Sequence, residues 1–260
     1  MNEHDQEILT LLTRLKLYGL AANYENYRNE PWLQNLLQLE QDERKRRSLE
    51  NRLRLANLGS YKPMVEYDWS WPTAVERYQC EEILNVGFVS QGSNVVIMGS
   101  NGLGKTMLLK NIGYQAVLAG YQVLFRTASD LLRDLGAQES MQGRARRLKY
   151  YCQPALLCID EVGYLSYDNT HADLLFEVVS RRYNANKSIA LTTNRVFSEW
   201  SEVFPNSACV VTLVDRLVHR AELVKLEGDS YRKKEAIEAQ ERRSKERLGK
   251  AKSKPKPRDD

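Results

Sequence analysis

The chain has 260 residues, of which 42% are hydrophobic and 28% are charged, and its formal net charge is +4. This size and composition are typical of a soluble globular protein with one α/β domain and a smaller appendage. No apolar run approaches the roughly 18 residues that span a bilayer, and the opening MNEHDQEILT lacks the basic start and apolar core of a signal peptide, so we expect a cytosolic protein.

The first 60 residues carry leucines at helical spacing, which predicts a small helical domain. Pro31 is well placed at the start of its second helix. Residues 43–54 put six basic side chains on a predicted helix, together with Glu43 and Glu50. This segment has the charge either of a nucleic-acid-binding face or of a solvated face, and taken alone we favour the solvated face.

A linker and then a sheet follow the helical domain. Residues 61–72 have the proline and aromatic content of a linker that still packs against another part of the chain. From residue 73 onward, short apolar runs alternate with helical stretches, which predicts a parallel sheet with crossover helices and a ligand site at the carboxyl ends of the strands. The runs are residues 94–98, 122–126, 155–160 and 188–193.

Residues 99–106 read GSNGLGKT and lie between a predicted strand and a predicted helix. Its glycines would let backbone amides turn onto phosphate oxygens, Lys105 would reach the outer phosphates, and the Thr106 hydroxyl would hold magnesium. A glycine turn without a ligand is the alternative, but the strand and helix around the loop favour a nucleotide. The candidate ATP-binding residues are Gly99, Ser100, Asn101, Gly102, Leu103, Gly104, Lys105, Thr106 and Met107.

Polar side chains follow two further apolar runs. Asp160 would act on the metal through water, and Glu161 would polarise the water that attacks the terminal phosphate. Asn194 is placed to hold that water by its side-chain amide. Structural roles are the alternatives: adjacent acids after a strand also occur as ordinary helix caps, and Asn after a strand is a common turn residue. Beside the phosphate loop, these three residues predict hydrolysis of a nucleoside triphosphate.

If subunits of this protein stack around DNA, a basic surface must line the bore, and our candidate for it is residues 143–151, which read GRARRLKYY. Contacts of this kind grip the phosphate backbone without reading bases. A solvated helix face is the equally supported alternative. The candidate DNA-binding residues are Arg144, Arg146, Arg147 and Lys149.

The motifs GSNGLGKT, LLCIDEVGYL, LTTN, LVDRLVHRA and GDSYR, in this order, resemble the IstB family, the ATPase partners of a class of bacterial transposases. This family belongs to the AAA+ ATPases and is related to DnaC-like helicase loaders. The resemblance covers about residues 60–232. It implies an AAA+ P-loop three-layer sandwich at 73–232, preceded by an all-helical domain at 1–60 for DNA, partner and oligomer contacts.

The resemblance also implies that ATP is hydrolysed between subunits, with Mg²⁺. Arg216 matches the arginine that completes the site of a neighbouring subunit, and Arg232 matches the sensor arginine that contacts the terminal phosphate in the same chain. Taken alone, Arg216 would be assigned to an ion pair with Asp215 or a neighbouring acid. The implied partners are double-stranded DNA, an IstA-like transposase and further copies of the chain in a ring or spiral. The implied location is the bacterial cytoplasm, with nucleoid association on DNA.

Residues 233–260 form a basic segment that we expect to be flexible, serving either for solubility or for phosphate contact. The cysteines show no metal-ligand spacing and are expected to be reduced, packed thiols; they are Cys80, Cys152, Cys158 and Cys209. We favour a transposition helper. A DnaC-like helicase loader is the main alternative, and a small-molecule kinase is a third, for which no lid segment is evident.

Overall fold

The computed structural model describes residues 3–164, 168–204 and 207–252. The chain forms two compact units, Met1–Arg54 and Leu55–Asp260. Among the helices of the described residues, none combines the length and the apolarity that crossing a membrane requires. The four cysteines are free thiols, of which Cys80 and Cys158 are fully buried.

The first unit is helical, as predicted, and packs around a small apolar core that includes Leu12 and Leu33. Its long helix begins at Pro31, where proline costs no hydrogen bond because the first-turn amides have no partner within the helix. Along that helix Glu43 accepts hydrogen bonds from Arg46 and Arg47, which lower its pKa to about 2. The helices are α1 (Glu3–Arg14), α2 (Tyr18–Ala22), α3 (Tyr24–Tyr27) and α4 (Pro31–Ala56).

The second unit contains a parallel five-stranded sheet in the order β2-β3-β4-β1-β5. The four predicted apolar runs form four of these strands, and the fifth was not predicted. β4 is buried along its whole length, and β1 and β3 along most of theirs, as the continuous apolar runs of a covered parallel sheet require. The strands are β1 (Asn94–Gly99), β2 (Val123–Thr127), β3 (Leu156–Val162), β4 (Ser188–Thr193) and β5 (Ala221–Leu226).

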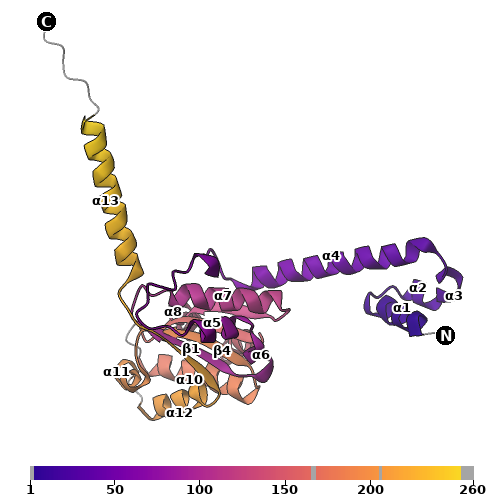
Figure 1. Cartoon of the computed structure of the whole chain (residues 1–260). Coiled ribbons are helices and arrows are strands. Elements are labelled where there is room, and N and C mark those ends of the chain that lie inside the picture. Colours follow the sequence, from indigo (N-terminus) through magenta and orange to yellow (C-terminus); the bar gives the residue numbers. More distant parts are fainter. Residues whose placement is uncertain (1–2, 165–167, 205–206, 253–260) are drawn as a thin grey trace, which may run out of the picture. The chain divides into compact units, whose positions relative to one another are not determined.

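Helices cover both faces of the sheet, which confirms the predicted three-layer α/β architecture (Figure 1). Helix α7 (Lys105–Leu118) packs on one face with α5 (Arg77–Leu84) beside it. The other face carries α8, α10 and α12, whose apolar side chains share one core with those of the strands. The remaining elements are η1 (Met64–Glu66), α6 (Gly87–Gln91), α8 (Ala128–Gly136), α9 (Met141–Cys152), α10 (Asn169–Asn184), η2 (Phe197–Glu199), α11 (Trp200–Val203), α12 (Ser207–Val218) and α13 (Tyr231–Lys252).

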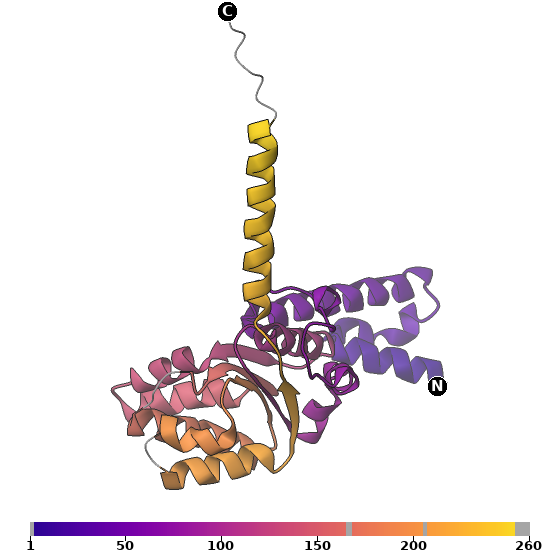
Figure 2. The ribbon, with the colours of Figure 1, turned by 60° about the vertical axis from the view of Figure 1, so that its left-hand side comes forward.

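The end of the chain differs from the flexible segment expected over residues 233–260. Figure 2 shows the chain passing from β5 by a short connection into the helix α13. This stretch is rich in Ala, Glu, Gln, Lys and Arg, which favour helix, and its first turn is tied to the linker by the ion pairs Lys234–Asp68 and Glu235–Lys62. Residues 253–260, with the lysine and proline repeat, lie outside the described residues.

Candidate functional site

The glycine-rich loop connects β1 to α7, as its sequence predicts. Its glycines adopt positive φ, and at Gly104 a Cβ atom would lie 2.5 Å from the ring of Tyr67. Gly102 is similarly closed to a side chain because Ser230 packs against it. The Lys105 ammonium donates hydrogen bonds to the carbonyls of Gly99 and Ser100 at 2.7 and 2.8 Å. Glycine is therefore required at positions 102 and 104 both by the backbone conformation and by the close packing of Ser230 and Tyr67.

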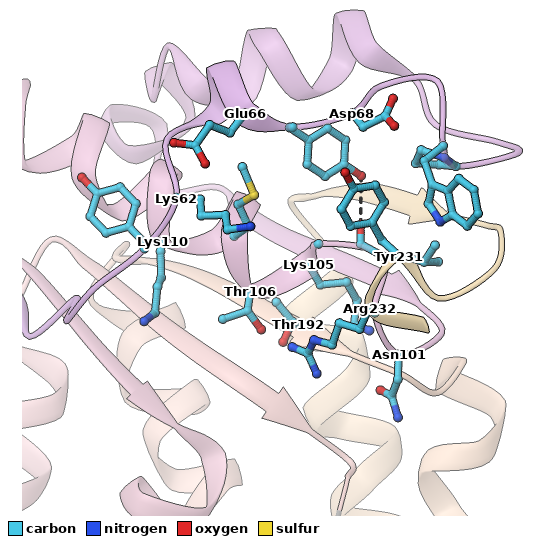
Figure 3. A pocket seen from close by; sticks show the side chains of 18 of the residues that line it. Lys62, Glu66, Asp68, Asn101, Lys105, Thr106, Lys110, Thr192, Tyr231 and Arg232 are labelled. Atoms are coloured by element: carbon cyan, nitrogen blue, oxygen red, sulfur yellow. Dashed lines mark hydrogen bonds between the residues drawn. The ribbon is translucent and has the colours of Figure 1, made fainter. Parts of the chain in front are cut away.

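A pocket of about 350 Å³ lies against this loop. Of the nine candidate ATP-binding residues, the seven from Asn101 to Met107 line it, whereas Gly99 and Ser100 contact Lys105 instead. The carboxyl ends of β3 and β4, the linker and the start of α13 supply the other walls. Figure 3 shows Lys105, Thr106, Thr192 and Arg232 close together in this pocket.

The acidic pair lies at the tip of β3, and its two members have different surroundings. Asp160 is buried and accepts hydrogen bonds from the hydroxyls of Thr106 at 3.1 Å and Thr192 at 2.5 Å. Glu161 has φ of 61° and lines the pocket with an exposed side chain, and its backbone N–H donates to Thr192 Oγ1 at 2.9 Å. Thr192 thus links both acids, a role that its place in the quoted LTTN did not reveal.

The backbone of β3 is irregular where the two neighbouring acids lie. The pairing of β3 with β4 shifts register between Ile159 and Val162, and Glu161 sits in this irregular stretch. A non-glycine residue with positive φ is uncommon and costs free energy, so such a conformation is a feature of functional sites more often than of regular strands. Asp160 is buried beside Thr106, and Glu161 is exposed and lines the pocket.

The closing GDSYR segment brings Arg232 to the loop. The backbone N–H of Tyr231 donates to the carbonyl of Gly102 at 3.0 Å, and the Ser100 hydroxyl donates to the carbonyl of Gly228. Burial lowers the pKa of Lys105, Asp160 opposes this shift, and the nearby charge of Arg232 lowers the pKa further. Two cations so close together favour an anionic ligand between them.

The linker forms the upper wall of the pocket, which the sequence analysis did not assign to the site. The Tyr67 hydroxyl donates to the carbonyl of Leu103 at 2.9 Å, and the Trp71 indole N–H donates to the carbonyl of Asp229 at 2.7 Å. The Lys234 ammonium lies 4.4 Å from the Trp71 ring centroid. Figure 3 shows Glu66 and Asp68 of the linker on this wall, with Tyr231 of α13. The aromatic content of residues 61–72 was the available signal.

The candidate metal ligands Thr106 and Asp160 lie within hydrogen-bond distance of each other. No group of three or more His, Cys, Asp and Glu side chains gathers like metal ligands within the described part of the chain. One hydroxyl and one carboxylate beside a phosphate loop are nevertheless a suitable donor set for Mg²⁺, which usually takes one or two protein oxygens and completes its shell with substrate phosphates and water.

The other candidate residues divide between this pocket and two distant surfaces. Asn194 is exposed at the end of β4 and lines the pocket. Arg216 lies on α12 and lines a different cavity. Among the described residues Arg216 pairs neither with Asp215 nor with another acid, which was the alternative for this residue; it donates to the Ser180 hydroxyl.

The four candidate DNA-binding residues share α9, but one differs from the others. Arg147 forms a bidentate ion pair with Asp134 of α8, and its Cζ atom lies 4.8 Å from the ring centroid of Tyr150. It therefore links α8 and α9. Arg144, Arg146 and Lys149 are exposed. Among the four candidates, these three are exposed and Arg147 is half-buried.

Comparisons with known proteins agree with this geometry. The family model described as "IstB-like ATP binding protein" matches residues 10–239. A protein of insertion sequence IS5376 from Geobacillus stearothermophilus, named as ATP-binding, is 33% identical over 232 residues, which cover 89% of this chain and 92% of that protein. The corresponding protein of IS21 from Pseudomonas aeruginosa is 33% identical over 244 residues, covering 90% and 91%.

Among solved structures, DnaI aligns with a TM-score of 0.53 at 19% identity, covering 66% of this chain and 90% of that chain. A DNA replication initiation factor aligns with a TM-score of 0.51 at 23% identity, covering 68% and 54%. At these identities the likeness shows a shared fold and nothing about activity or partners.

Proposed function

Because the chain belongs to the family of IstB-like ATP-binding proteins, we propose that it is an ATP-hydrolysing helper of a bacterial insertion-sequence transposase. Its relatives are named as ATP-binding proteins of insertion sequences. In this proposal the chain assembles with ATP on double-stranded DNA, recruits the transposase, and uses hydrolysis to control assembly and release. The helical domain at residues 1–60 contributes DNA, partner or oligomer contacts.

The observation that carries the proposal is the convergence of four separate segments on one pocket. The phosphate loop, the β3 tip with Glu161, the β4 end with Asn194, and Arg232 at the start of α13 all line it. A site for nucleotide binding alone has no need of an exposed carboxylate and an amide opposite the phosphate loop. Hydrolysis needs both, because the attacking water must be oriented and deprotonated.

We assign the chemical roles as follows. The loop amides and Lys105 hold the phosphates, Glu161 polarises the attacking water, and Asn194 orients it. Thr192 fixes the backbone at Glu161 and the carboxylate of Asp160 through its two hydrogen bonds. Arg232 meets the terminal phosphate from within the chain. When bound, Mg²⁺ held by Thr106 and Asp160 supplies charge neutralisation at the outer phosphates.

Removing the Lys105 ammonium tests the nucleotide site. Lys105→Ala is expected to abolish saturable ATP binding, because the outer phosphates lose the only lysine of the loop. A fluorescent ATP analogue titrated into the purified protein measures this. Lys225→Ala is the matched control, since Lys225 is an exposed lysine on β5 that pairs with Glu227 outside the pocket. ATP binding of Lys105→Ala at parent affinity contradicts the assignment of the loop.

The exposed basic face of α9 is the proposed contact with the DNA backbone. Each phosphate contact contributes about 0.9 to the slope of log affinity against log salt, so the double variant Arg144→Ala, Arg146→Ala is expected to reduce the slope by about 2. Duplex binding measured at four or more salt concentrations gives this slope. Arg133→Ala on α8 is the control, because Arg133 is an exposed arginine paired with Asp130. An unchanged slope in the double variant rules out this surface.

A DnaC-like helicase loader is the second candidate function, which the AAA+ fold permits. It predicts preference for single-stranded DNA and a complex with a hexameric helicase. The family membership of the chain favours the transposition helper.

A further inference from the structure

The excess positive charge of the chain is concentrated on the helix α13, which Figure 2 shows as one continuous element. Its 22 residues contain nine Lys and Arg against four Glu. The whole chain has 38 Lys and Arg against 34 Asp and Glu, so the residues outside α13 carry 29 against 30 and are nearly neutral. The helix therefore accounts for the positive net charge of +4.

Packing explains only the start of this helix. Its first turn is tied to the linker by the two ion pairs described above. Beyond that turn, every side chain of α13 whose exposure the structure describes is exposed, at residues 235–240, 242 and 243. These side chains contribute nothing to a hydrophobic core, so their charges face solvent and are available to another molecule.

A row of basic residues runs along one side of the second half of α13. Arg243, Arg247 and Lys250 follow one another at spacings of four and three positions, which places them on the same face of a helix. Arg243 is exposed and has no carboxylate partner among the residues that the structure describes. Glu246 is the only acid within three or four positions of any of the three. We call these three residues the basic stripe.

The basic residues on the other side of α13 have a different setting. Arg242 and Lys245 each follow a glutamate by four positions, Glu238 and Glu241, and opposite charges at this spacing stabilise a helix. The two arginines of the basic stripe instead stand four positions apart, where like charges repel each other. The stripe therefore does not help to form the helix, and it suits an anion supplied from outside the chain.

The other basic helix segment, residues 43–54 of α4, is neutralised within the helix. Its basic residues from 44 to 47 all have carboxylate partners close by in sequence. The ion pairs are Arg44–Glu40, Lys45–Asp42, Arg46–Glu43, Arg46–Glu50 and Arg47–Glu43. This segment has the charge pattern of a solvated face, which the basic stripe of α13 lacks.

The composition of α13 favours a nucleic acid over a lipid surface. A helix that lies on a membrane needs an apolar face opposite its basic one. Ile237 and Leu248 are the only large aliphatic residues of α13, which is too few for such a face. A row of cations without an apolar face matches the regularly spaced phosphates of a nucleic-acid backbone.

We propose that the basic stripe of α13 binds phosphates of the DNA backbone, as a second contact separate from that of α9. The inference rests on the proposed function, which supplies duplex DNA as the partner. Because such a contact depends on charge, it does not select a base sequence. Of the two roles expected for the basic segment at residues 233–260, the proposal selects phosphate contact.

The salt dependence of duplex binding tests this contact. Binding is measured at four or more salt concentrations with a non-hydrolysable ATP analogue, for the parent and the double variant Arg243→Ala, Arg247→Ala. Each phosphate contact contributes about 0.9 to the slope of log affinity against log salt, so the variant is expected to reduce the slope by about 2. Between about 50 and 200 mM salt, its affinity then falls about tenfold less than that of the parent.

The double variant Arg242→Ala, Lys245→Ala is the matched control, because it removes the same charge from the other side of the same helix. It is expected to change the slope much less. Alanine favours helix, and circular dichroism checks that α13 is kept. If helix is lost, Arg243→Gln, Arg247→Gln decides in the same measurement. Arg243→Lys, Arg247→Lys is expected to keep the parent slope, since only charge is required.

Three results would overturn the inference. The first is a parent-like slope in the alanine variant, and the second is an equal reduction in the matched control, which would indicate a general effect of net charge. The third is an unchanged slope together with lost binding to phosphatidylglycerol vesicles, which would assign the basic stripe to a membrane surface.

The proposed function fails by a different result. A parent protein that binds duplex DNA but does not hydrolyse ATP refutes the proposed ATPase, while the slopes still decide the inference because the analogue makes binding independent of turnover. A parent that hydrolyses ATP but does not bind duplex DNA at any salt concentration overturns the inference and leaves the ATPase standing.

Discussion

Arg216→Ala is expected to lower ATP turnover about a thousandfold or more while leaving ATP affinity close to that of the parent. Arg216 is remote from the pocket of its own chain, so its loss does not disturb nucleotide binding there. In the proposed oligomer it meets charge that develops on a neighbour's nucleotide only in the transition state, where an arginine has effects of this size. Turnover and fluorescent-nucleotide binding measured on the same preparation separate the two quantities.

A control must separate the loss of the guanidinium from a loss of packing, because Arg216 also contacts Phe176 and Ser180. Arg216→Lys keeps the charge and much of the stem but lacks the planar fork, so it is expected to recover only a small part of the activity. Thermal melting shows whether either variant is unfolded. Folded Arg216→Ala protein with turnover within threefold of the parent would exclude a role for this arginine in hydrolysis.

Glu161→Gln is expected to reduce turnover by about 100- to 10,000-fold, the range for loss of a general base. The amide has nearly the shape of the carboxylate, and the backbone hydrogen bond from residue 161 to Thr192 does not involve the side chain. ATP binding is therefore retained. Since hydrolysis is proposed to release the assembly, this variant is also expected to dissociate from duplex DNA more slowly than the parent.

Dissociation is measured by challenging preformed complexes with excess unlabelled duplex in the presence of ATP. Glu199→Gln serves as the matched control, because Glu199 lies near the end of β4 but outside the pocket and contacts Arg195. Faster release of DNA by Glu161→Gln than by the parent would show that hydrolysis does not reset the assembly.

The central layer of the fold could be predicted because its strands are continuous apolar runs. Such runs, alternating with helical stretches, are typical of a parallel sheet covered on both faces, and four of the five strands followed from them. β5 is different: its Ala221–Leu226 sequence is interrupted by the charged Glu222 and Lys225, and the strand lies at an edge of the sheet. Its pairing with β1 depends on a tertiary contact that the local pattern does not reveal.

The phosphate loop and the acidic pair could be assigned because their chemistry depends on residues close together in sequence. Thr192 and Tyr67 could not, because their roles arise from hydrogen bonds across 31 and 36 positions of the chain. The pairing of Arg147, which its exposed basic neighbours on α9 lack, also depends on a residue distant in sequence. Its partner Asp134 lies on the preceding helix, which charge counting along α9 does not take into account.

The helix α13 shows a limit of reasoning from composition. A charged segment with few apolar residues cannot bury enough apolar surface to form a hydrophobic core of its own. Such a composition is compatible with an exposed helix as well as with a flexible chain. The contacts of Lys234 with Asp68 and Trp71 tie its first turn to the linker. Arg232 is therefore placed by a structured helix start.

The most direct test of the proposed function is steady-state ATP turnover of the purified protein alone, with long duplex DNA, and with single-stranded DNA of equal nucleotide content. We expect the duplex to stimulate ATP turnover strongly and the single strand to stimulate it less. Preference for the single strand would favour a helicase loader. Turnover that neither DNA changes would contradict a DNA-dependent helper, and no turnover under any condition would refute the ATPase assignment itself.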